Sequence, residues 1–284
     1  MKRIPIIVLL SVLGFSSIGS VSDAKRRSER RRAVAVPSGK VEIHCPTPLN
    51  DITDCMHLDP DTGCGPALDP NLNEQKNIRS KGGASEAMTL QDLKDLPDPV
   101  PGFEIGDDRQ PLKDLGEGKK ITIMAYALVA RKGGTESCNC GLGQAKDTDN
   151  HIVLVEEETL ALTRKATPAK PATATRKALR ARTARENTLD VRERQSVTAE
   201  FTPRVRLDHP KLAGARLQSL IEATPKKALL VRVTGLLMFD SQHSLESHLK
   251  RVNNWEIHPV LKMESCPTGE SCTESSDNWM DLEN

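Results

Sequence analysis

Aromatic side chains are scarce in this chain, whose 284 residues include four Phe, two Trp and one Tyr. The hydrophobic fraction of 37% is also modest, and together the two values argue against two large, tightly packed cores. Neither charge sign dominates, because 40 Lys and Arg residues stand against 39 Asp and Glu. The net charge of +1 therefore gives the whole chain no attraction to nucleic acid or to an acidic surface.

Long apolar runs are missing except near the start, between residues 4 and 18, where the run follows two basic residues and precedes small residues ending at Ala24. This three-part pattern predicts a signal peptide over residues 1–24. A membrane anchor would need about 20 apolar residues, and this run is shorter and contains Pro5. We expect cleavage after Ala24, a periplasmic or secreted product, and no stable membrane insertion of that product.

The chain has seven cysteines, and all of them follow the predicted cleavage site: Cys45, Cys55, Cys64, Cys138, Cys140, Cys266 and Cys272. Disulfides are the usual state of cysteine in an oxidising compartment. Because seven is odd, at least one thiol stays free, binds a metal or pairs with another chain. The spacing leaves the connectivity open.

The part of the chain from residue 119 to 264 contains five segments with the composition of β-strands. They span residues 120–130, 151–156, 196–202, 229–240 and 255–264. A helical pattern at residues 210–223 lies between the third and the fourth segment. Three strands, a helix and two strands is the order of an OB-fold, a five-stranded Greek-key barrel. The predicted class is mainly β with this barrel; a plain antiparallel sheet with one helix is the alternative.

Three further regions surround this barrel. Residues 25–118 read as a basic arm, from Lys25 to Arg32, followed by a loop-rich extension that contains cysteines and one short helix near residues 89–96. Residues 159–195 form a low-complexity insertion with ten basic and three acidic residues, a composition typical of disorder. Residues 265–284 contain five acidic and no basic residues, so we expect a solvated acidic tail.

A series of short motifs follows in order along the chain: Cys138-Asn139-Cys140, Asp149-x-His151-Ile152, Thr202-Pro203-Arg204, His209-Pro210, Gly235 to His243, and Trp255 to Pro259, with Leu72 to Arg79 upstream. This set resembles a group of uncharacterised exported bacterial proteins with an OB-like barrel. The resemblance covers residues 45–80 and 119–264, and the insertion departs from it. It implies a fold and a compartment, and it carries no activity.

One group of candidate ligands lies around the two loops that flank the binding face of an OB barrel. Cys138, Cys140, Asp149 and His151 belong to the first loop or its end, and His243 belongs to the last loop. Thiolate and imidazole groups suit zinc or copper, so zinc is the candidate cofactor. The alternative is that the cysteines form disulfides and the histidines are hydrogen-bonded surface residues.

A second group is the candidate catalytic trio Glu256, His258 and Arg232. Strand alternation places Glu256 and His258 on the outer face of the last strand, and Arg232 lies on the neighbouring strand. Such a trio can bind phosphate or act in general acid–base catalysis. A cross-strand ladder of salt bridges is the commoner role, and it is the one we expect.

Common catalytic signatures are missing: the sequence contains no nucleophile elbow, no phosphate-binding glycine loop and no His-Glu-x-x-His motif. The basic stretches from Lys25 to Arg32 and from Arg164 to Arg194 allow weak binding of polyanions. The sequence thus favours an exported binding or interaction module over an enzyme, and it does not identify the ligand. The alternative is a metal-dependent hydrolase that acts on phosphodiesters.

Overall fold

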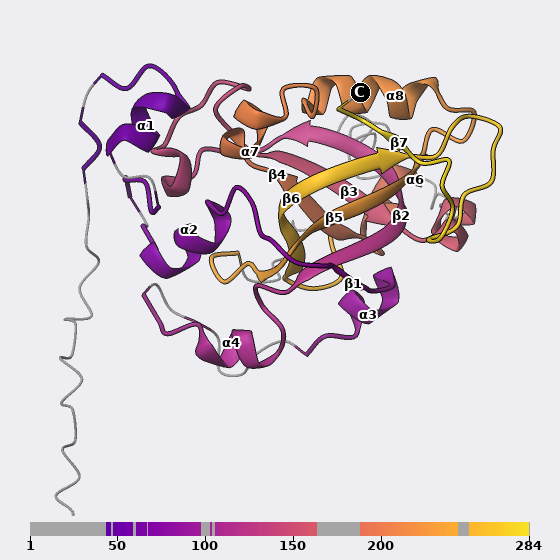
Figure 1. The fold of residues 1–284 in the computed structure, drawn as a ribbon, viewed down its shortest axis with the longest axis horizontal. Helices are drawn as coiled ribbons and strands as arrows, with labels where there is room; N and C mark the ends of the chain where they lie inside the picture. The colour runs from indigo at the N-terminus through magenta and orange to yellow at the C-terminus, as the bar shows by residue number, and fades with distance from the viewer. Residues whose placement is uncertain are drawn as a thin grey trace, which may run out of the picture. The chain divides into compact units, whose positions relative to one another are not determined.

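A computed structural model describes residues 44–46, 48–58, 61–66, 68–97, 103, 106–163, 188–243 and 250–283 (Figure 1). The predicted signal peptide, the basic arm and the middle of the insertion lie outside these residues. No helix among the described residues is long and apolar enough to cross a membrane.

Five strands close into a barrel: β2 (Lys120–Lys132), β3 (Asn150–Val155), β4 (Val197–Phe201), β5 (Leu229–Phe239) and β6 (Trp255–Ser265). β2 pairs with β3, β3 with β4, and β5 with both β6 and β2, all antiparallel. The parallel pairing of β4 with β6 completes the ring. This is the strand order of the OB-fold, so the predicted fold class is confirmed.

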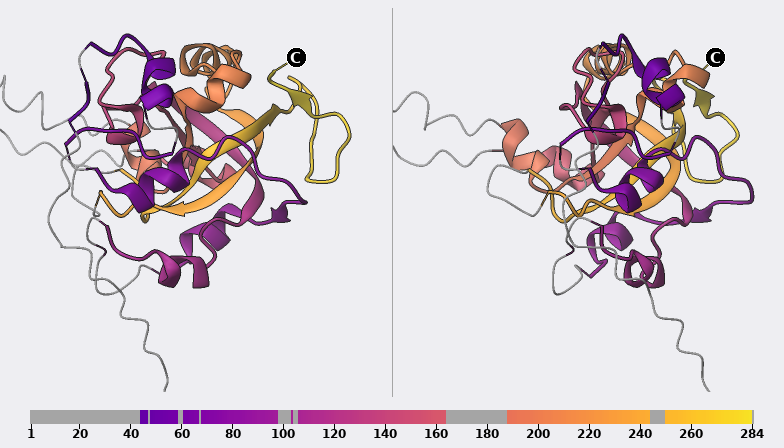
Figure 2. Two further views of the ribbon diagram at one scale, coloured as in Figure 1. Left: turned by 60° about the vertical axis from the view of Figure 1, so that its left-hand side comes forward. Right: turned by 90° about the vertical axis from the view of Figure 1, so that its left-hand side faces the viewer.

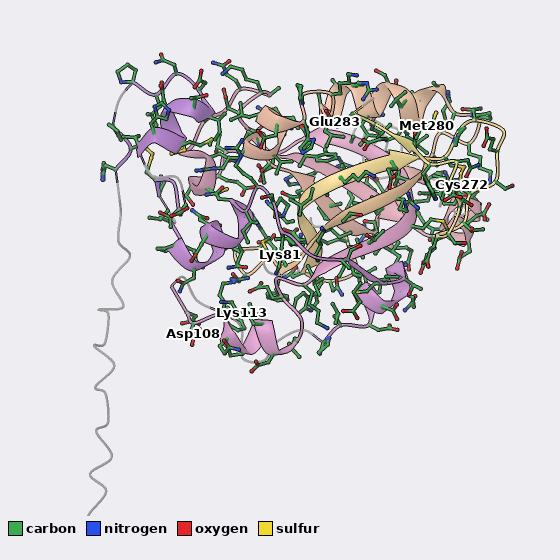
Figure 3. All side chains as sticks on the ribbon, in the orientation of Figure 1. Lys81, Asp108, Lys113, Cys272, Met280 and Glu283 are labelled. Carbon is green, nitrogen blue, oxygen red and sulfur yellow. A yellow bond between two sulfur atoms is a disulfide. The ribbon has the colours of Figure 1, made fainter. Side chains whose placement is uncertain are left out.

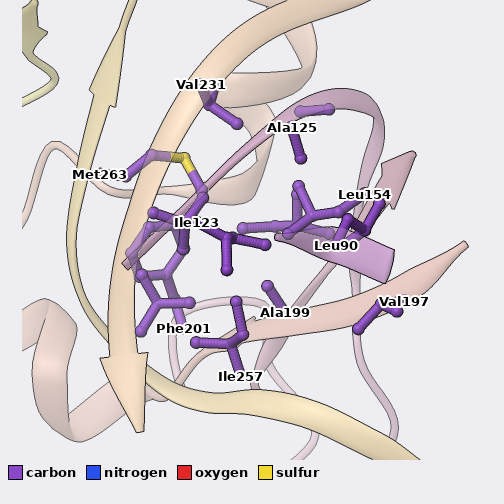
Figure 4. Packing of buried hydrophobic residues seen from close by; sticks show 14 of the residues in the cluster. Leu90, Ile123, Ala125, Leu154, Val197, Ala199, Phe201, Val231, Ile257 and Met263 are labelled. Atoms are coloured by element: carbon purple, nitrogen blue, oxygen red, sulfur yellow. The ribbon is translucent and has the colours of Figure 1, made fainter. Parts of the chain in front are cut away.

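The barrel closes around one apolar core, to which every strand contributes alternate side chains (Figure 4). Ile123, Ile257 and Phe201 are almost completely buried there. Gly235 lies at a register shift between β5 and β6. A Cβ atom on this glycine would lie 2.4 Å from Cγ2 of Ile257, so the close approach of the two strands requires glycine.

Two helices connect β4 to β5, where the sequence predicted one. α7 (Pro203–Asp208) begins after Thr202, whose side chain accepts a hydrogen bond from the Val205 backbone N–H. α8 (Gly214–Ala223) begins four residues later than predicted, and Leu217 and Ile221 face the core. A Cβ on Gly214 would lie 2.9 Å from the Asn150 side chain, so this helix starts in close contact with β3.

The N-terminal extension has more regular structure than predicted: α1 (Ile52–Leu58), α2 (Pro70–Lys76), β1 (Glu86–Ala87), α3 (Leu90–Lys94) and α4 (Gln110–Asp114). The predicted helix near residues 89–96 corresponds to α3, which starts with a reciprocal capping box between Thr89 and Asp92. Figure 2 shows these elements, in indigo and violet, against the barrel. α2 packs against β6 and the β2–β3 loop, so the outer face of β6 is covered.

Three disulfides form, Cys45–Cys64, Cys55–Cys140 and Cys266–Cys272. Cys138 is the free cysteine and is buried. The Cys55–Cys140 bridge ties the extension to the β2–β3 loop across a sequence separation of 85 residues. The disulfides predicted from the cysteine content are therefore present, and the odd cysteine is a free thiol.

The C-terminal segment differs from the solvated tail expected at residues 265–284. Its β7 (Met280–Asp281) pairs with β6, and Trp279 and Leu282 are buried. Figure 3 marks its course with the labels Cys272, Met280 and Glu283. The pairing with β6 and two buried apolar side chains hold the segment on the barrel in spite of its acidic composition, and the Cys266–Cys272 disulfide closes a loop within it.

Both described ends of the insertion are also folded. η2 (Glu157–Ala161) follows β3, and α6 (Thr188–Glu193) precedes β4. The guanidinium group of Arg192 donates to the backbone oxygens of Leu160 and Leu162, which ties the two ends together.

Candidate metal centre

A pocket of about 330 Å³ lies over β3 and β4. Its walls include Arg131 and Glu136 from the end of β2 and the loop after it, and His243 and Arg251 from the β5–β6 connection. Strands two and three of an OB barrel and the loops that flank them form the usual ligand-binding face of this fold. The pocket therefore occupies the position at which OB-folds bind.

Four side chains converge at this pocket: His151 on β3 and Glu200 on β4 line it, and Asp149, together with His258 on β6, is fully buried beside them. We call them the ligand set. The register of the strands brings them together, because His151 pairs directly with Glu200. In the parallel β4–β6 ladder, Thr198 pairs with Glu256, so His258 follows at the level of Glu200.

The donor atoms of the ligand set are close to one another. Nε2 of His151 lies 3.2 Å from Oε1 of Glu200, and Nε2 of His258 lies 3.5 Å from Oδ2 of Asp149. Nδ1 of His258 lies 3.3 Å from Oε2 of Glu200. One ligand atom from each of Asp149, Glu200 and His258 fits within a span of 4.8 Å, a separation that a single metal ion can bridge.

Each member of the ligand set has a buried polar atom that forms no hydrogen bond with any described residue: Asp149 Oδ2, His151 Nε2, Glu200 Oε2 and His258 Nε2. Asp149 and His258 are 0% exposed and Glu200 is 4% exposed. Buried polar atoms in proteins are nearly always hydrogen-bonded, because leaving one unpaired costs about 1–3 kcal/mol. Four such atoms in one place indicate a missing partner.

The opposite atoms of two of these side chains are held in place. Oδ1 of Asp149 accepts a hydrogen bond of 2.9 Å from the Asn139 side chain. Nδ1 of His258 lies 3.1 Å from Oε1 of Glu256, whose other oxygen accepts from Arg251. A carboxylate that fixes one histidine nitrogen and leaves the other free is the usual outer shell of a metal ligand.

Negative charge exceeds positive charge around the ligand set. Five carboxyl groups gather there, those of Glu136, Asp149, Glu200, Asp240 and Glu256, together with the cations Lys76, Arg251 and Arg206, the last of which interacts with Asp149. Burial and the neighbouring Glu136 raise the pKa of Asp149 to about 6. Burial and Glu256 raise the pKa of Glu200 well above its usual range. A divalent cation would compensate this excess of negative charge.

Lys76 and Glu136 form an ion pair of 2.5 Å that joins α2 to the β2–β3 loop. Burial opposes both charges, but their attraction is stronger: the pKa of Glu136 falls to about 2, and that of Lys76 rises well above its usual range. Both side chains line the pocket. Glu136 also has an oxygen within 4.8 Å of ligand atoms of His151 and Glu200.

Of the five predicted metal ligands, Asp149 and His151 belong to the ligand set. Cys140 is bonded to Cys55 and is excluded as a ligand. Cys138 lies beside the ligand set: its thiol is 3.4 Å from Oε2 of Glu136 and within 4.8 Å of a carboxylate oxygen of Asp149. Burial raises the pKa of this thiol well above the usual value. His243 lies at the pocket wall with Nδ1 2.9 Å from Oδ2 of Asp240, a contact that raises the pKa of its imidazole.

The three residues of the predicted catalytic trio do not come together: Arg232 lies apart from Glu256 and His258. Glu256 and His258 do face away from the barrel core, but the extension covers them and they are 1% and 0% exposed. Arg232 pairs in register with Glu264 and binds it through Nε at 2.7 Å and Nη2 at 2.9 Å. Arg232 also packs over Trp279. The sequence placed Arg232 near Glu256 and His258 only if the strand register allowed it. The β5–β6 register does not, because it places Glu256 opposite Met238 and Arg232 opposite Glu264.

Sequence reasoning missed Glu200, Glu136 and Lys76. Glu200 lies in a predicted strand, and its alternation with Phe201, which packs in the core, is the signal that could have placed it on the outer face. Lys76 was part of the motif from Leu72 to Arg79, which carried no chemical assignment. Only the pairing of β3, β4 and β6 and the packing of α2 bring these residues to one point.

No protein-family model, curated protein or solved structure gives a significant match to this chain. The chemistry of the site is therefore argued from its own residues. Two imidazoles and two carboxylates are a donor set that suits zinc and related divalent transition metals.

Proposed function

We propose that this protein is an exported binding module that holds a divalent transition-metal ion at the base of its OB-fold pocket. The ligands are Asp149, His151, Glu200 and His258. The observation that carries this proposal is the convergence of four buried donor atoms that have no hydrogen-bond partner among the described residues. A cation between Asp149, Glu200 and His258, whose ligand atoms lie within 4.8 Å of one another, would satisfy these three residues and offset the surplus of carboxylates. His151 would join as the fourth ligand from its position 3.2 Å from Glu200.

The separations of the donor atoms support zinc as the preferred ion. Zinc binds imidazole nitrogen and carboxylate oxygen at about 2.0–2.2 Å in a tetrahedral arrangement, which places ligand atoms about 3.3 Å apart. The observed separations of 3.2 Å, between His151 and Glu200, and 3.5 Å, between His258 and Asp149, are close to this value. Manganese and iron accept similar ligands and are the competitors to test.

Export of the chain to the periplasm or the medium is part of the proposal. Three disulfides in a chain of this size are typical of an oxidising compartment. The predicted signal peptide and the resemblance to exported bacterial proteins support the same assignment.

The test is metal binding by the full mature chain with its disulfides intact. The protein is stripped with a chelator, and zinc, manganese and iron(II), each in its own experiment, are titrated by calorimetry, with metal content measured after dialysis. We expect one ion per chain and a preference for zinc. Glu200→Gln and His258→Gln should lower the affinity at least 100-fold.

A matched control is available at the other end of the barrel. Glu264→Gln also removes a largely buried carboxylate from a strand, and it lies outside the ligand set. His209→Gln, at the end of α7, controls for loss of a histidine. Both controls should bind metal as the parent chain does. Equal affinity in all four variants, or no binding by the parent, would contradict the proposal.

A further inference from the structure

The donor groups at the pocket form two triads that share Glu200. Glu136, His151 and Glu200 are the outer triad, and Asp149, Glu200 and His258 are the inner triad. Within each triad, one ligand atom from each residue lies within 4.8 Å of the other two. All three residues of the outer triad line the pocket, whereas Asp149 and His258 are 0% exposed. One triad therefore faces the pocket, and the other is buried beside it.

We propose that the outer triad is a second, transient metal position, through which an ion enters and leaves the buried site. This inference rests on the proposed metal site and adds to it a route and a further ligand, Glu136. An ion from solvent is bound first by the outer triad. It then moves to the ligand set and releases Glu136.

The move requires only an exchange of ligands. The ion keeps its bonds to His151 and Glu200, whose Nε2 and Oε1 lie 3.2 Å apart. Its bond to Glu136 breaks, and bonds to Oδ2 of Asp149 and Nε2 of His258 form. These last two atoms lie 3.5 Å apart, and both lack a hydrogen-bond partner among the described residues. The charge of the ion does not change.

Glu136 offers a permanent negative charge to an arriving cation. Its ion pair with Lys76 lowers the pKa of the carboxyl group to about 2, so it is ionised at neutral pH. A pocket wall of one charge raises the local concentration of the opposite ion and the rate of its association. The role of Glu136 in this route is to bind the ion and not to move protons.

Lys76 makes the outer position the weaker of the two. Its ammonium group lies 2.5 Å from Oε2 of Glu136 and so competes with a metal ion for this carboxylate. The ligands of the inner triad are instead held by groups that favour metal binding. Asn139 donates to Oδ1 of Asp149, and Glu256 pairs with Nδ1 of His258. An ion in the outer triad is therefore passed inward.

The test measures the rates at which zinc binds to and leaves the full mature chain with its disulfides intact. Association is followed by rapid mixing of the stripped chain with zinc and a fluorescent zinc indicator. Dissociation is followed by mixing the loaded chain with an excess of a coloured chelator at several concentrations. Glu136→Gln should lower both rates at least about 10-fold and change Kd by less than about 3-fold, because it removes a stage of the route and no final ligand.

A simple loss of attractive charge gives a different result. It lowers the association rate and leaves the dissociation rate unchanged, so the affinity falls. Glu193→Gln is the matched control, because Glu193 also lines the pocket and pairs with Arg131 at 2.6 Å outside both triads. This control should keep both rates within about 3-fold of the parent values. Equal slowing by Glu136→Gln and Glu193→Gln would overturn the proposal.

A double variant removes the effect of net charge and the unpaired lysine that Glu136→Gln leaves buried. Lys76→Gln combined with Glu136→Gln replaces the ion pair with two amides, and the chain keeps its parent net charge. Zinc should still bind and leave at least about 10-fold more slowly than in the parent, because the outer triad lacks its carboxylate. Parent rates in this double variant would contradict the route through Glu136.

Equilibrium binding tests the outer position separately. Asp149→Asn combined with His258→Gln removes the two ligands that belong to the inner triad alone. Addition of Glu136→Gln to this variant should weaken its residual zinc binding at least about 5-fold, although the same change hardly alters Kd of the parent; such non-additivity is expected when the ion sits in different positions. An equal effect of Glu136→Gln in both backgrounds would mean that no ion occupies the outer triad.

The two proposals fail in different ways. A parent chain that binds no zinc overturns the proposed function. A parent chain that binds zinc through the ligand set, with unchanged rates in Glu136→Gln, leaves the metal site intact and overturns the entry route.

Discussion

Oε2 of Glu200 lies 3.3 Å from Nδ1 of His258, but the two buried atoms are not hydrogen-bonded to each other. The oxygen has no hydrogen-bond partner among the described residues, and the nitrogen pairs with Oε1 of Glu256. The two residues come from β4 and β6, the parallel pair that closes the barrel. The strand pairing that closes the barrel therefore also brings Glu200 and His258 of the ligand set together.

Metal binding should stabilise the folded chain. A ligand at 100 times its dissociation constant contributes about 2.7 kcal/mol if it binds only the folded state. For a chain of this size, that corresponds to a rise in Tm of roughly 5–10 °C. Differential scanning calorimetry with and without zinc, and after addition of a chelator, checks this. A Tm that zinc leaves unchanged would count against the site.

The buried carboxylates of the ligand set should destabilise the metal-free chain at neutral pH. The pKa of Asp149 is about 6 in the folded chain and 3.8 as the reference value. A carboxyl group whose folded pKa is raised binds its proton more tightly when folded, so its contribution to stability is lost as pH rises from about 4 to 6. Asp149→Asn should therefore raise the free energy of unfolding at pH 7.5 by about 1–3 kcal/mol in the absence of metal.

Urea unfolding of the stripped protein at pH 5 and pH 7.5 measures this effect. The gain from Asp149→Asn should shrink at the lower pH, where the parent carboxyl group is largely protonated. In excess zinc, the order should reverse and the parent chain should be the more stable one. Destabilisation by Asp149→Asn at pH 7.5 without metal would show that the carboxylate has another partner.

Much of the barrel could be predicted from sequence because its strands follow a two-residue alternation. The segment predicted at residues 229–240 corresponds to β5 (Leu229–Phe239), and the one at 255–264 to β6 (Trp255–Ser265). The site could be predicted only in part. Asp149, His151, Glu256 and His258 carry visible chemistry, whereas Glu200 is an ordinary outward residue until the register of β4 and β6 is known.

The C-terminal segment shows a different limit of sequence reasoning. Its acidic composition predicted a solvated tail. Composition alone, however, does not show that two apolar side chains of the segment pack against the barrel. Trp279 packs under the Arg232 guanidinium, and Leu282 joins the barrel core. Burial of one large side chain contributes about 1.5–3 kcal/mol, enough to hold a short segment of unfavourable charge.

His243 should titrate above the usual range for histidine. The hydrogen bond to Asp240 raises its pKa, since the contact favours the protonated ring. The stabilisation that this pair contributes is present below the unfolded pKa of about 6.5 and is lost as pH rises through the higher folded value. NMR titration of the ring protons should show the raised pKa, and Asp240→Asn should lower it. An unchanged pKa in Asp240→Asn would remove the pair as the cause.

Cys138 should be inert in the folded chain. The thiol is 1% exposed, and burial, followed by the neighbouring Glu136, raises its pKa, so little reactive thiolate forms at neutral pH. A thiol reagent should detect no cysteine under native conditions and one per chain in denaturant. Peptide mapping without reduction should recover the Cys55–Cys140 bridge. Fast native labelling, or a Cys138–Cys140 crosslink, would contradict the prediction.

Two shortened variants should distinguish the contribution of the folded ends of the insertion to stability from that of its middle. Replacement of residues 164–187 with a short Gly-Ser linker should change the Tm by less than about 3 °C, because each doubling of loop length alters closure entropy by only about 0.6 kcal/mol. Replacement of residues 159–195 should lower the Tm by at least about 5 °C. The longer deletion removes α6, with Leu189 packed beside Val155 and Glu193 bound to Arg131 at 2.6 Å. Thermal unfolding of both variants in excess zinc decides the matter, and equal Tm values would mean that α6 contributes nothing to the barrel.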